Sequence, residues 1–298
     1  MNKFLITLVF ALSSTQAWSQ IREFQTTRLN ATAGAGVASI LSTEAAILNP
    51  ASSAFFSGNS ASYQRNRAAL TKKSDLRNSA NDKWPSRNES QGFFLSDHSS
   101  EVKGGMAYIQ QAENNHRREK MVLHGASPMG EGASVGVGYN YLQDKRPSGS
   151  SPRHQVHHQL NIGTTYIIDE STIVALIVQD PTRTTPEEER AIAGFQYNLA
   201  SRLTLIGDVG AQYTKDVSEK YLWRAAVQIN VFSDLFLRAG KFYDNVTEFK
   251  GTGWGAGWTG PRFGVEFGQK VSDQIGKGSY IYAEERITDT SLSAILKF

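Results

Sequence analysis

Residues 291–298 (SLSAILKF) alternate between apolar and mostly polar side chains up to the final phenylalanine. Successive side chains of a β-strand point to opposite faces, so Leu292, Ala294, Leu296 and Phe298 would share one face. The stretch therefore predicts a strand that has one apolar face and ends in an aromatic residue.

Residues 133–143 (ASVGVGYNYLQ) show the same alternation more strongly. One face carries apolar and aromatic side chains, and the other carries small or polar ones. Similar segments occur at 156–166, 191–199, 203–213, 221–231 and 263–267, and weaker ones near 58–67, 89–96, 103–111 and 119–126. Most of these segments approach the 9–11 residues that a tilted strand needs to cross a bilayer. An apolar face with aromatic ends is typical of strands that separate lipid from a lumen.

The segments between these strands alternate in length. Short connections are expected near 128–132, 169–171, 200–201, 233–234 and 260–261, and longer polar ones at 144–154, 181–189, 214–219 and 245–252. The polar run 69–88 is also expected to be an outer loop, and 279–286 either continue the last strand or form another such loop. Membrane barrels have short periplasmic turns and longer outer loops, so the longer set should face outward. The acidic run 186–189 is predicted to be a solvated part of such a loop.

The beginning of the chain has the order of a secretory signal peptide. A basic start at Lys3 is followed by the apolar stretch 4–12 and by small and polar residues up to Ser19. We predict that residues 1–19 are removed before Gln20, with cleavage after Ala17 as the alternative. An uncleaved interfacial helix is a further alternative.

Composition excludes several other classes of protein. The chain has no cysteine, which rules out disulfides and thiolate metal sites. Its net charge of +3 is too small and too evenly spread to indicate nucleic-acid binding. Beyond the signal peptide, no stretch approaches 18 consecutive apolar residues, so membrane-spanning helices are not expected.

These features together predict an all-β protein, a transmembrane antiparallel β-barrel in the cell outer membrane. We expect about 14 strands in residues 57–298, with 12 as an alternative, and an even number places both termini in the periplasm. Leu296 and Phe298 resemble the terminal insertion signal of such barrels, so outer-membrane lipids and the barrel-assembly machinery are the expected partners. A soluble β-sandwich would also show alternation, but it would not explain the export signal and the aromatic strand ends.

Residues 28–56 (RLNATAGAGVASILSTEAAILNPASSAFF) differ from the strands that follow. A small, flexible stretch at 34–38 precedes a short helix that Ser42 or Thr43 could cap and that would extend to Leu48. Asn49-Pro50 should end this helix, because proline disfavours the helical conformation at the residue before it. We predict that residues 20–56 form a plug inside the barrel, since a lumen of about 14 strands is too wide for wall side chains alone to fill.

The order of this segment resembles that of the FadL/TodX outer-membrane transport proteins and the related PorV-like barrels. The matching residues are Gly34, Gly36, Val37 and Ala38, followed by Asn49, Pro50 and Ala51. The resemblance implies a 14-stranded barrel with an N-terminal hatch, in which Gly34, Gly36, Asn49 and Pro50 belong to the plug or gate. It further implies passage of a small hydrophobic compound, or, as the alternative, a structural or partner-binding barrel of the PorV-like type without transport.

Four charged residues fall on predicted inward faces: Asp208, Arg224, Arg238 and Glu266. Arginine facing lipid at mid-bilayer would cost about 2–4 kcal/mol, so these groups should point into the lumen. Asp208 and Arg224 flank one hairpin and could form an internal ion pair or a polar constriction.

No residues form a recognisable catalytic or metal-binding constellation. His154, His157 and His158 are close in sequence, but a strand would turn His157 to the opposite face from the other two. A phospholipase would need a serine and a histidine in defined positions, and no feature selects such a pair. We therefore predict no enzyme activity, no cofactor and no metal, and we expect Trp254 and Trp258 to anchor the barrel at the membrane interface.

Overall fold

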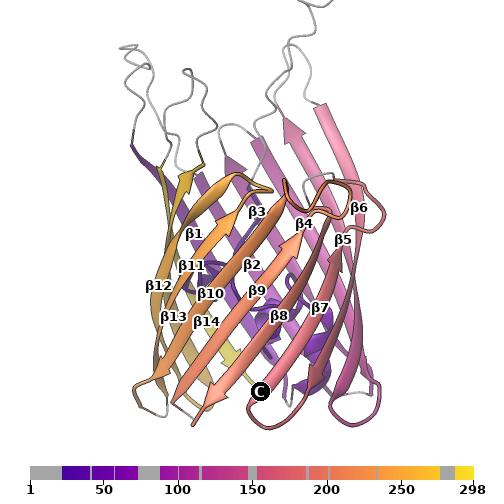
Figure 1. Ribbon diagram of the computed structural model, residues 1–298, viewed down its shortest axis with the longest axis vertical. Coiled ribbons are helices and arrows are strands. Elements are labelled where there is room, and N and C mark those ends of the chain that lie inside the picture. The colour runs from indigo at the N-terminus through magenta and orange to yellow at the C-terminus, as the bar shows by residue number, and fades with distance from the viewer. Residues whose placement is uncertain are drawn as a thin grey trace, which may run out of the picture.

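The protein is a closed barrel of 14 antiparallel strands, in which each strand pairs with its sequence neighbours and the last closes against the first (Figure 1). The computed structural model describes residues 22–40, 42–56, 58–72, 88–99, 101–113, 116–146, 153–185, 188–200, 202–232, 234–275 and 286–298. The strands are β1 (Ser60–Lys72), β2 (Asn88–Asp97), β3 (Lys103–Glu113), β4 (His116–Pro128), β5 (Ala133–Arg146), β6 (Arg153–Ile167), β7 (Thr172–Gln179), β8 (Arg190–Leu199), β9 (Leu203–Ala211), β10 (Tyr221–Asn230), β11 (Leu235–Asp244), β12 (Phe249–Thr259), β13 (Phe263–Gln274) and β14 (Arg286–Lys297). The prediction of about 14 strands is confirmed.

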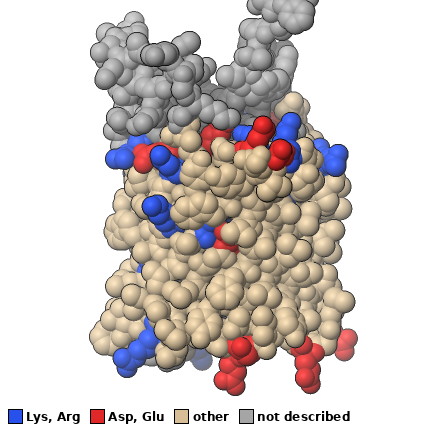
Figure 2. Space-filling view, viewed as in Figure 1, with Lys and Arg blue, Asp and Glu red and all other residues tan. Residues whose placement is uncertain are grey.

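The two faces of the strands follow the sequence alternation. On β5, Val137 and Tyr139 are 49% and 38% exposed on the outside, whereas Asn140 and Leu142 are buried inside. Trp254 and Trp258 also point outward, as predicted. In the view of Figure 2 most charged side chains gather near the two ends of the barrel, and most of the surface between them is uncharged. This apolar outer band identifies the barrel as membrane-spanning, because apolar surface of this extent is stable only in contact with lipid.

The end of the chain closes the barrel. β14 pairs with β1 in register from Ser60 opposite Lys297 to Leu70 opposite Ile287. Phe298 continues this pairing through two backbone hydrogen bonds with Asn59, both 3.1 Å long. Leu296 and Phe298 lie on the outward face and are 51% and 69% exposed.

Some sequence expectations need correction. β7, β11 and β12 were not among the alternating segments named from the sequence, although the expected connections left room for them. On β7 the inward residues Ile173, Ala175 and Ile177 are apolar and hide the alternation. The predicted outer loop at 245–252 is short, since β12 already begins at Phe249. The signal peptide 1–19 and most of the loops expected at 69–88, 144–154 and 279–286 lie outside the described residues.

The N-terminal segment lies inside the barrel, where it is coloured indigo in Figure 1. It contains α2 (Thr27–Ala31), α3 (Ser42–Ala45) and a 3-10 helix, η1 (Pro50–Phe55). α2 packs against β11–β14, and η1 packs against β3–β6. The predicted helix from Ser42 to Leu48 is thus shorter, and α2 and η1 were not expected. No helix in the described part of the chain is long and apolar enough to span a membrane.

Candidate functional site

Wall glycines provide the space in which the N-terminal segment sits. A Cβ at Gly253 would overlap the carbonyl of Asn30, and one at Gly268 would overlap the carbonyl of Thr27. Glycines at 136, 163, 194 and 240 lie against the segment in the same way. The backbone of the segment therefore touches the backbone of the wall, which only glycine permits at this distance.

Polar contacts fix the segment at the predicted glycines. The carboxylate of Asp208 accepts hydrogen bonds from the backbone N–H groups of Gly36, at 2.8 Å, and Val37, at 3.2 Å. Arg224 donates to the carbonyl of Gly34 at 3.0 Å. Gly34 and Gly36 have φ angles of 89° and 156°, in the left-handed region that favours glycine.

The expected ion pair between Asp208 and Arg224 is not formed. The two residues are cross-strand partners, as predicted, and both are buried. However, Asp208 binds the N-terminal backbone, and Arg224 approaches Asp244 at 3.7 Å. Asp208 and Arg224 thus bind the N-terminal segment rather than each other.

Asn49 and Pro50 hold the other half of the segment. The Asn49 side chain caps η1 by accepting from the N–H of Ala51, and it donates to the carbonyl of Val37 and to Thr165 of β6, both at 3.0 Å. Pro50 occupies the first turn of η1, where its missing N–H has no cost. Asn49 therefore connects the middle of the segment, at Val37, to β6 of the wall.

Arg238 and Glu266 form a separate pair on the inner wall. Their side chains approach to 3.0 Å, and Arg238 also donates to Gln228 at 2.8 Å. The four charged residues predicted for the lumen therefore all face inward. Asp208 and Arg224 bind the N-terminal segment, whereas Arg238 and Glu266 pair with each other.

The inner wall carries two apolar surfaces that the segment covers. One cluster joins wall residues of β7, β8 and β10, including Ile177, Ile192 and Leu222, to Leu29, Val37 and Leu48 of the segment. The other joins Phe94, Ile109 and Val122 of β2–β4 to Phe24 and Ala46. Ile47 packs against both clusters, so the segment fills a passage whose walls are partly hydrophobic.

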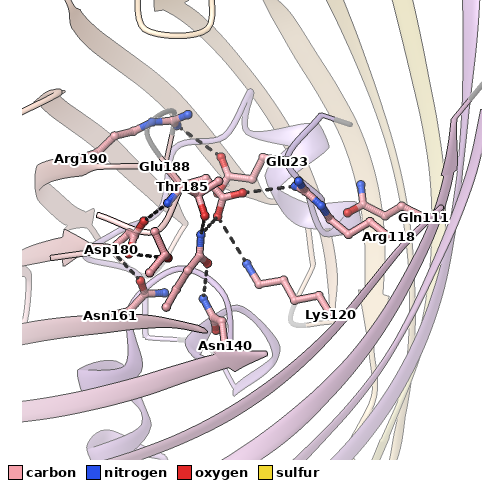
Figure 3. Close-up of polar contacts among 12 residues, drawn as sticks. Glu23, Gln111, Arg118, Lys120, Asn140, Asn161, Asp180, Thr185, Glu188 and Arg190 are labelled. Carbon is pink, nitrogen blue, oxygen red and sulfur yellow. Dashed lines mark hydrogen bonds and ion pairs between the residues drawn. The ribbon is translucent and has the colours of Figure 1, made fainter. Parts of the chain in front are cut away.

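The described residues of the outer connection between β7 and β8, 180–185 and 188–189, turn into the lumen (Figure 3). Glu188 lies 3.3 Å from Arg118 and 4.0 Å from Lys120, and it accepts from Gln159 at 3.0 Å. Asp180 accepts from the backbone N–H of Thr185 at 2.6 Å, which holds the connection in a tight turn. Burial by itself would raise the pKa of the Glu188 carboxyl, but Lys120 and Arg118 lower that pKa below its ordinary value.

The prediction of a solvated acidic loop is therefore wrong for Glu188 and Glu189. The Glu188 side chain is 16% exposed and Glu189 is buried. The physical reason for Glu188 is the basic inner wall, because Arg118 and Lys120 lie on the inward face of β4 and attract it into the lumen. Glu189 instead accepts a hydrogen bond from Thr214 at 2.6 Å.

The N-terminal segment also reaches this outer connection. Arg190, at the start of β8, pairs with Glu23 at 3.3 Å, and Gln111 of β3 donates to the carbonyl of Arg22 at 2.8 Å. On the opposite wall Arg22 pairs with Asp289 at 2.9 Å. Arg22 and Glu23 thus contact β3, β8 and β14 inside the barrel.

The histidines do not form a metal site. His154 and His158 lie on the outward face of β6, and the ring of His158 contacts Tyr139 at 2.6 Å. Within the described ranges no three histidine, aspartate or glutamate residues are placed to hold a metal ion.

A membrane barrel whose lumen is filled by its own N-terminal segment is a plugged transmembrane β-barrel. The sequence matches no protein-family model and no curated protein sequence. Solved structures, however, share the whole fold. Similar structures include the CymD monoaromatic hydrocarbon channel, with a TM-score of 0.69 and 12% identity over 92% of this chain and 97% of that one. The Ralstonia pickettii toluene transporter TbuX has a TM-score of 0.70 and 11% sequence identity over 93% of this chain and 99% of that one. The P. putida toluene transporter TodX has a TM-score of 0.67 and 10% sequence identity over 93% of this chain and 99% of that one. The chain thus has the FadL/TodX-type fold, as the resemblance implied.

Proposed function

We propose that this protein lets small hydrophobic compounds cross the outer membrane, with residues 20–56 as the movable plug. The observation that carries the proposal is the pair of apolar surfaces on the inner wall. A water-filled pore would have a polar lining, whereas here Ile177, Ile192 and Phe94 face the lumen and are covered by the plug. Displacement of the plug would uncover apolar surface, which binds apolar solutes and not sugars or ions.

The fold similarity supports the same substrate class, since CymD is a monoaromatic hydrocarbon channel and TbuX and TodX are toluene transporters. Toluene is therefore the first probe. Cells that produce this chain should take up toluene faster than cells that lack it. The double variant Ile177→Asn/Ile192→Asn makes one wall polar and should reduce this uptake, while uptake of a small sugar stays unchanged.

The plug is tested by conductance in planar bilayers. Deletion of residues 28–56 should leave an inserted barrel with raised conductance. If the deleted barrel does not assemble, Gly253→Ala and Gly268→Ala provide a second route, because each added methyl would overlap a plug carbonyl. Overpacking of this kind costs about 1–3 kcal/mol.

Gly207→Ala is the matched control for these glycine variants. Gly207 lies on the outward face of β9, and nothing comes closer to its added Cβ than the Arg224 carbonyl at 4.0 Å. Its conductance should equal that of the wild type. Equal conductance of the full-length and plug-deleted barrels would remove the support for a gate, and unchanged toluene uptake in the double variant would remove the support for an apolar path.

A further inference from the structure

Charge is unevenly distributed over the outer surface of the barrel, and the outward faces of β11–β14 carry Lys241, Lys250, Asp273 and Arg286. The outward positions of β7–β10, all of them described, hold no charged residue along their full length. On β1–β5, by contrast, two consecutive rows of outward positions near the outer strand ends carry Arg65, Arg67, Glu89, Arg117, Glu119 and Lys145. A general need for polar strand ends does not account for this difference between β7–β10 and β1–β5.

The rows lie directly beyond the aromatic belt of the same wall. Tyr63, Phe93 and Tyr108 are consecutive register partners on β1–β3, and the row continues through Met121 to Tyr141. Two residues along a tilted strand rise about 5 Å, so the charged rows lie within about 10 Å of the belt. Aromatic belts mark the membrane interface, which places the charged rows at the level of the lipid headgroups.

The side chains of these rows are held in place by one another. Gln91 donates to Gln110 at 2.7 Å, and Gln110 donates to the hydroxyl of Tyr108 at 2.9 Å. Arg65 and Arg67 both contact Glu89, at 2.7 Å and 3.1 Å. A cavity of about 450 Å³ at this level is lined by Arg65, Glu89, Gln110 and Arg117 and also by inward-facing residues, among them Gln111 and Arg118.

The net charge of the patch indicates which kind of ligand it could bind. Four basic and two acidic side chains leave a formal surplus of two positive charges on this patch. Arg117 makes no ion pair with any residue that the structure describes. The glutamines and tyrosine hydroxyls can bind sugar hydroxyls, arginine binds phosphate well, and the apolar belt below suits acyl chains.

We propose that this patch of β1–β5 binds a phosphorylated glycolipid of the outer leaflet, with Arg65 and Arg117 as the phosphate-binding residues. Arg65 and Arg117 themselves lie on the outward faces of β1 and β4. Lipid binding by these residues can therefore be tested without reference to the proposed transport function.

The test uses the full-length barrel in detergent and native mass spectrometry with diphosphoryl lipid A. The wild-type protein should bind this lipid at least about tenfold more tightly than phosphatidylethanolamine. Arg65→Gln/Arg117→Gln should weaken lipid A binding about tenfold or more, since a basic residue near an anionic headgroup contributes about 1 kcal/mol. Arg67 stays in this variant so that Glu89 keeps a partner.

Lys241→Gln/Lys250→Gln is the matched control, because both lysines lie on outward faces of β11 and β12, away from the patch. It should change binding less than twofold. The single variant Arg117→Gln gives a second measurement if the double variant fails to assemble. Equal losses in both double variants, equal binding of phosphatidylethanolamine, or displacement of lipid A by millimolar inorganic phosphate would each overturn the proposal. Formation of a dimer through this face without binding of lipid A would also overturn the proposal.

Discussion

Replacing Asp208 should loosen the plug. Its carboxylate accepts hydrogen bonds from the N–H groups of Gly36 and Val37, which lie inside the barrel, and Val37 is fully buried. Hydrogen bonds to charged groups contribute about 1.5–3 kcal/mol each. Asp208→Ala removes both bonds and leaves the two donors without partners, so the closed state should lose about 3 kcal/mol or more.

This loss converts directly into the population of the open barrel. At 1.4 kcal/mol per tenfold change, about 3 kcal/mol raises the ratio of open to closed barrels by about 100-fold. Asp208→Asn keeps one acceptor oxygen but loses the charge, so its effect should be intermediate. Single-channel recordings in planar bilayers would measure the open fraction in the order wild type, Asn variant and Ala variant.

Glu266→Gln is the control for this series. Glu266 is also an acidic residue of the inner wall, but it pairs with Arg238 and not with the plug backbone. Its variant should keep a low open fraction. If Asp208→Ala conducts like the wild type, or Glu266→Gln opens the barrel equally, the plug is not held by the Asp208 contacts.

Three further predictions concern the assembly and the outer mouth. Deletion of Phe298 removes both hydrogen bonds to Asn59 and should lower the outer-membrane level without changing signal-peptide cleavage; unchanged assembly would make this residue incidental. The barrel should show a β-sheet circular dichroism spectrum and altered electrophoretic mobility when unheated, and a helical spectrum would contradict the fold. The pKa of Glu188 is lowered in the folded protein. The pairing of Glu188 with Arg118 and Lys120 therefore stabilises the folded protein fully at pH values above the ordinary pKa of 4.5. This stabilisation is lost as the pH falls from 4.5 through the lower pKa of the folded state. Conductance should therefore stay constant from neutral pH down to about 4.5 and rise below it, and Glu188→Gln should already conduct more at neutral pH and remove this rise.

The strands could be predicted because their pattern is local. Each side chain of β5 or β9 faces lipid or lumen according to its position in an alternation of period two, which can be read without knowing the partner strand. No alternating segment was recognised at β7, because Ile173, Ala175 and Ile177 are apolar on the inward face as well. These inward side chains are apolar because plug residues cover them, and the local sequence pattern does not show those contacts.

The lumen was predicted only in outline. The inward direction of Asp208, Arg224, Arg238 and Glu266 follows from the cost of charge in lipid, but their partners do not. The wall glycines could have predicted part of the packing in the lumen. Gly253 and Gly268 lie on inward faces, and glycine within a strand often marks a place where another backbone comes close.

By itself the sequence determined that this chain forms membrane-spanning strands, which face of each strand meets lipid, and which segment is suited to the lumen. These properties depend on residues that are neighbours along the chain. Only the tertiary structure decided that Asp208 binds Gly36, 172 residues away, and that Glu188 turns inward to Arg118, 70 residues away. Such contacts form only once the barrel closes, because closure brings distant charges together in a space with little water, where each must find a partner.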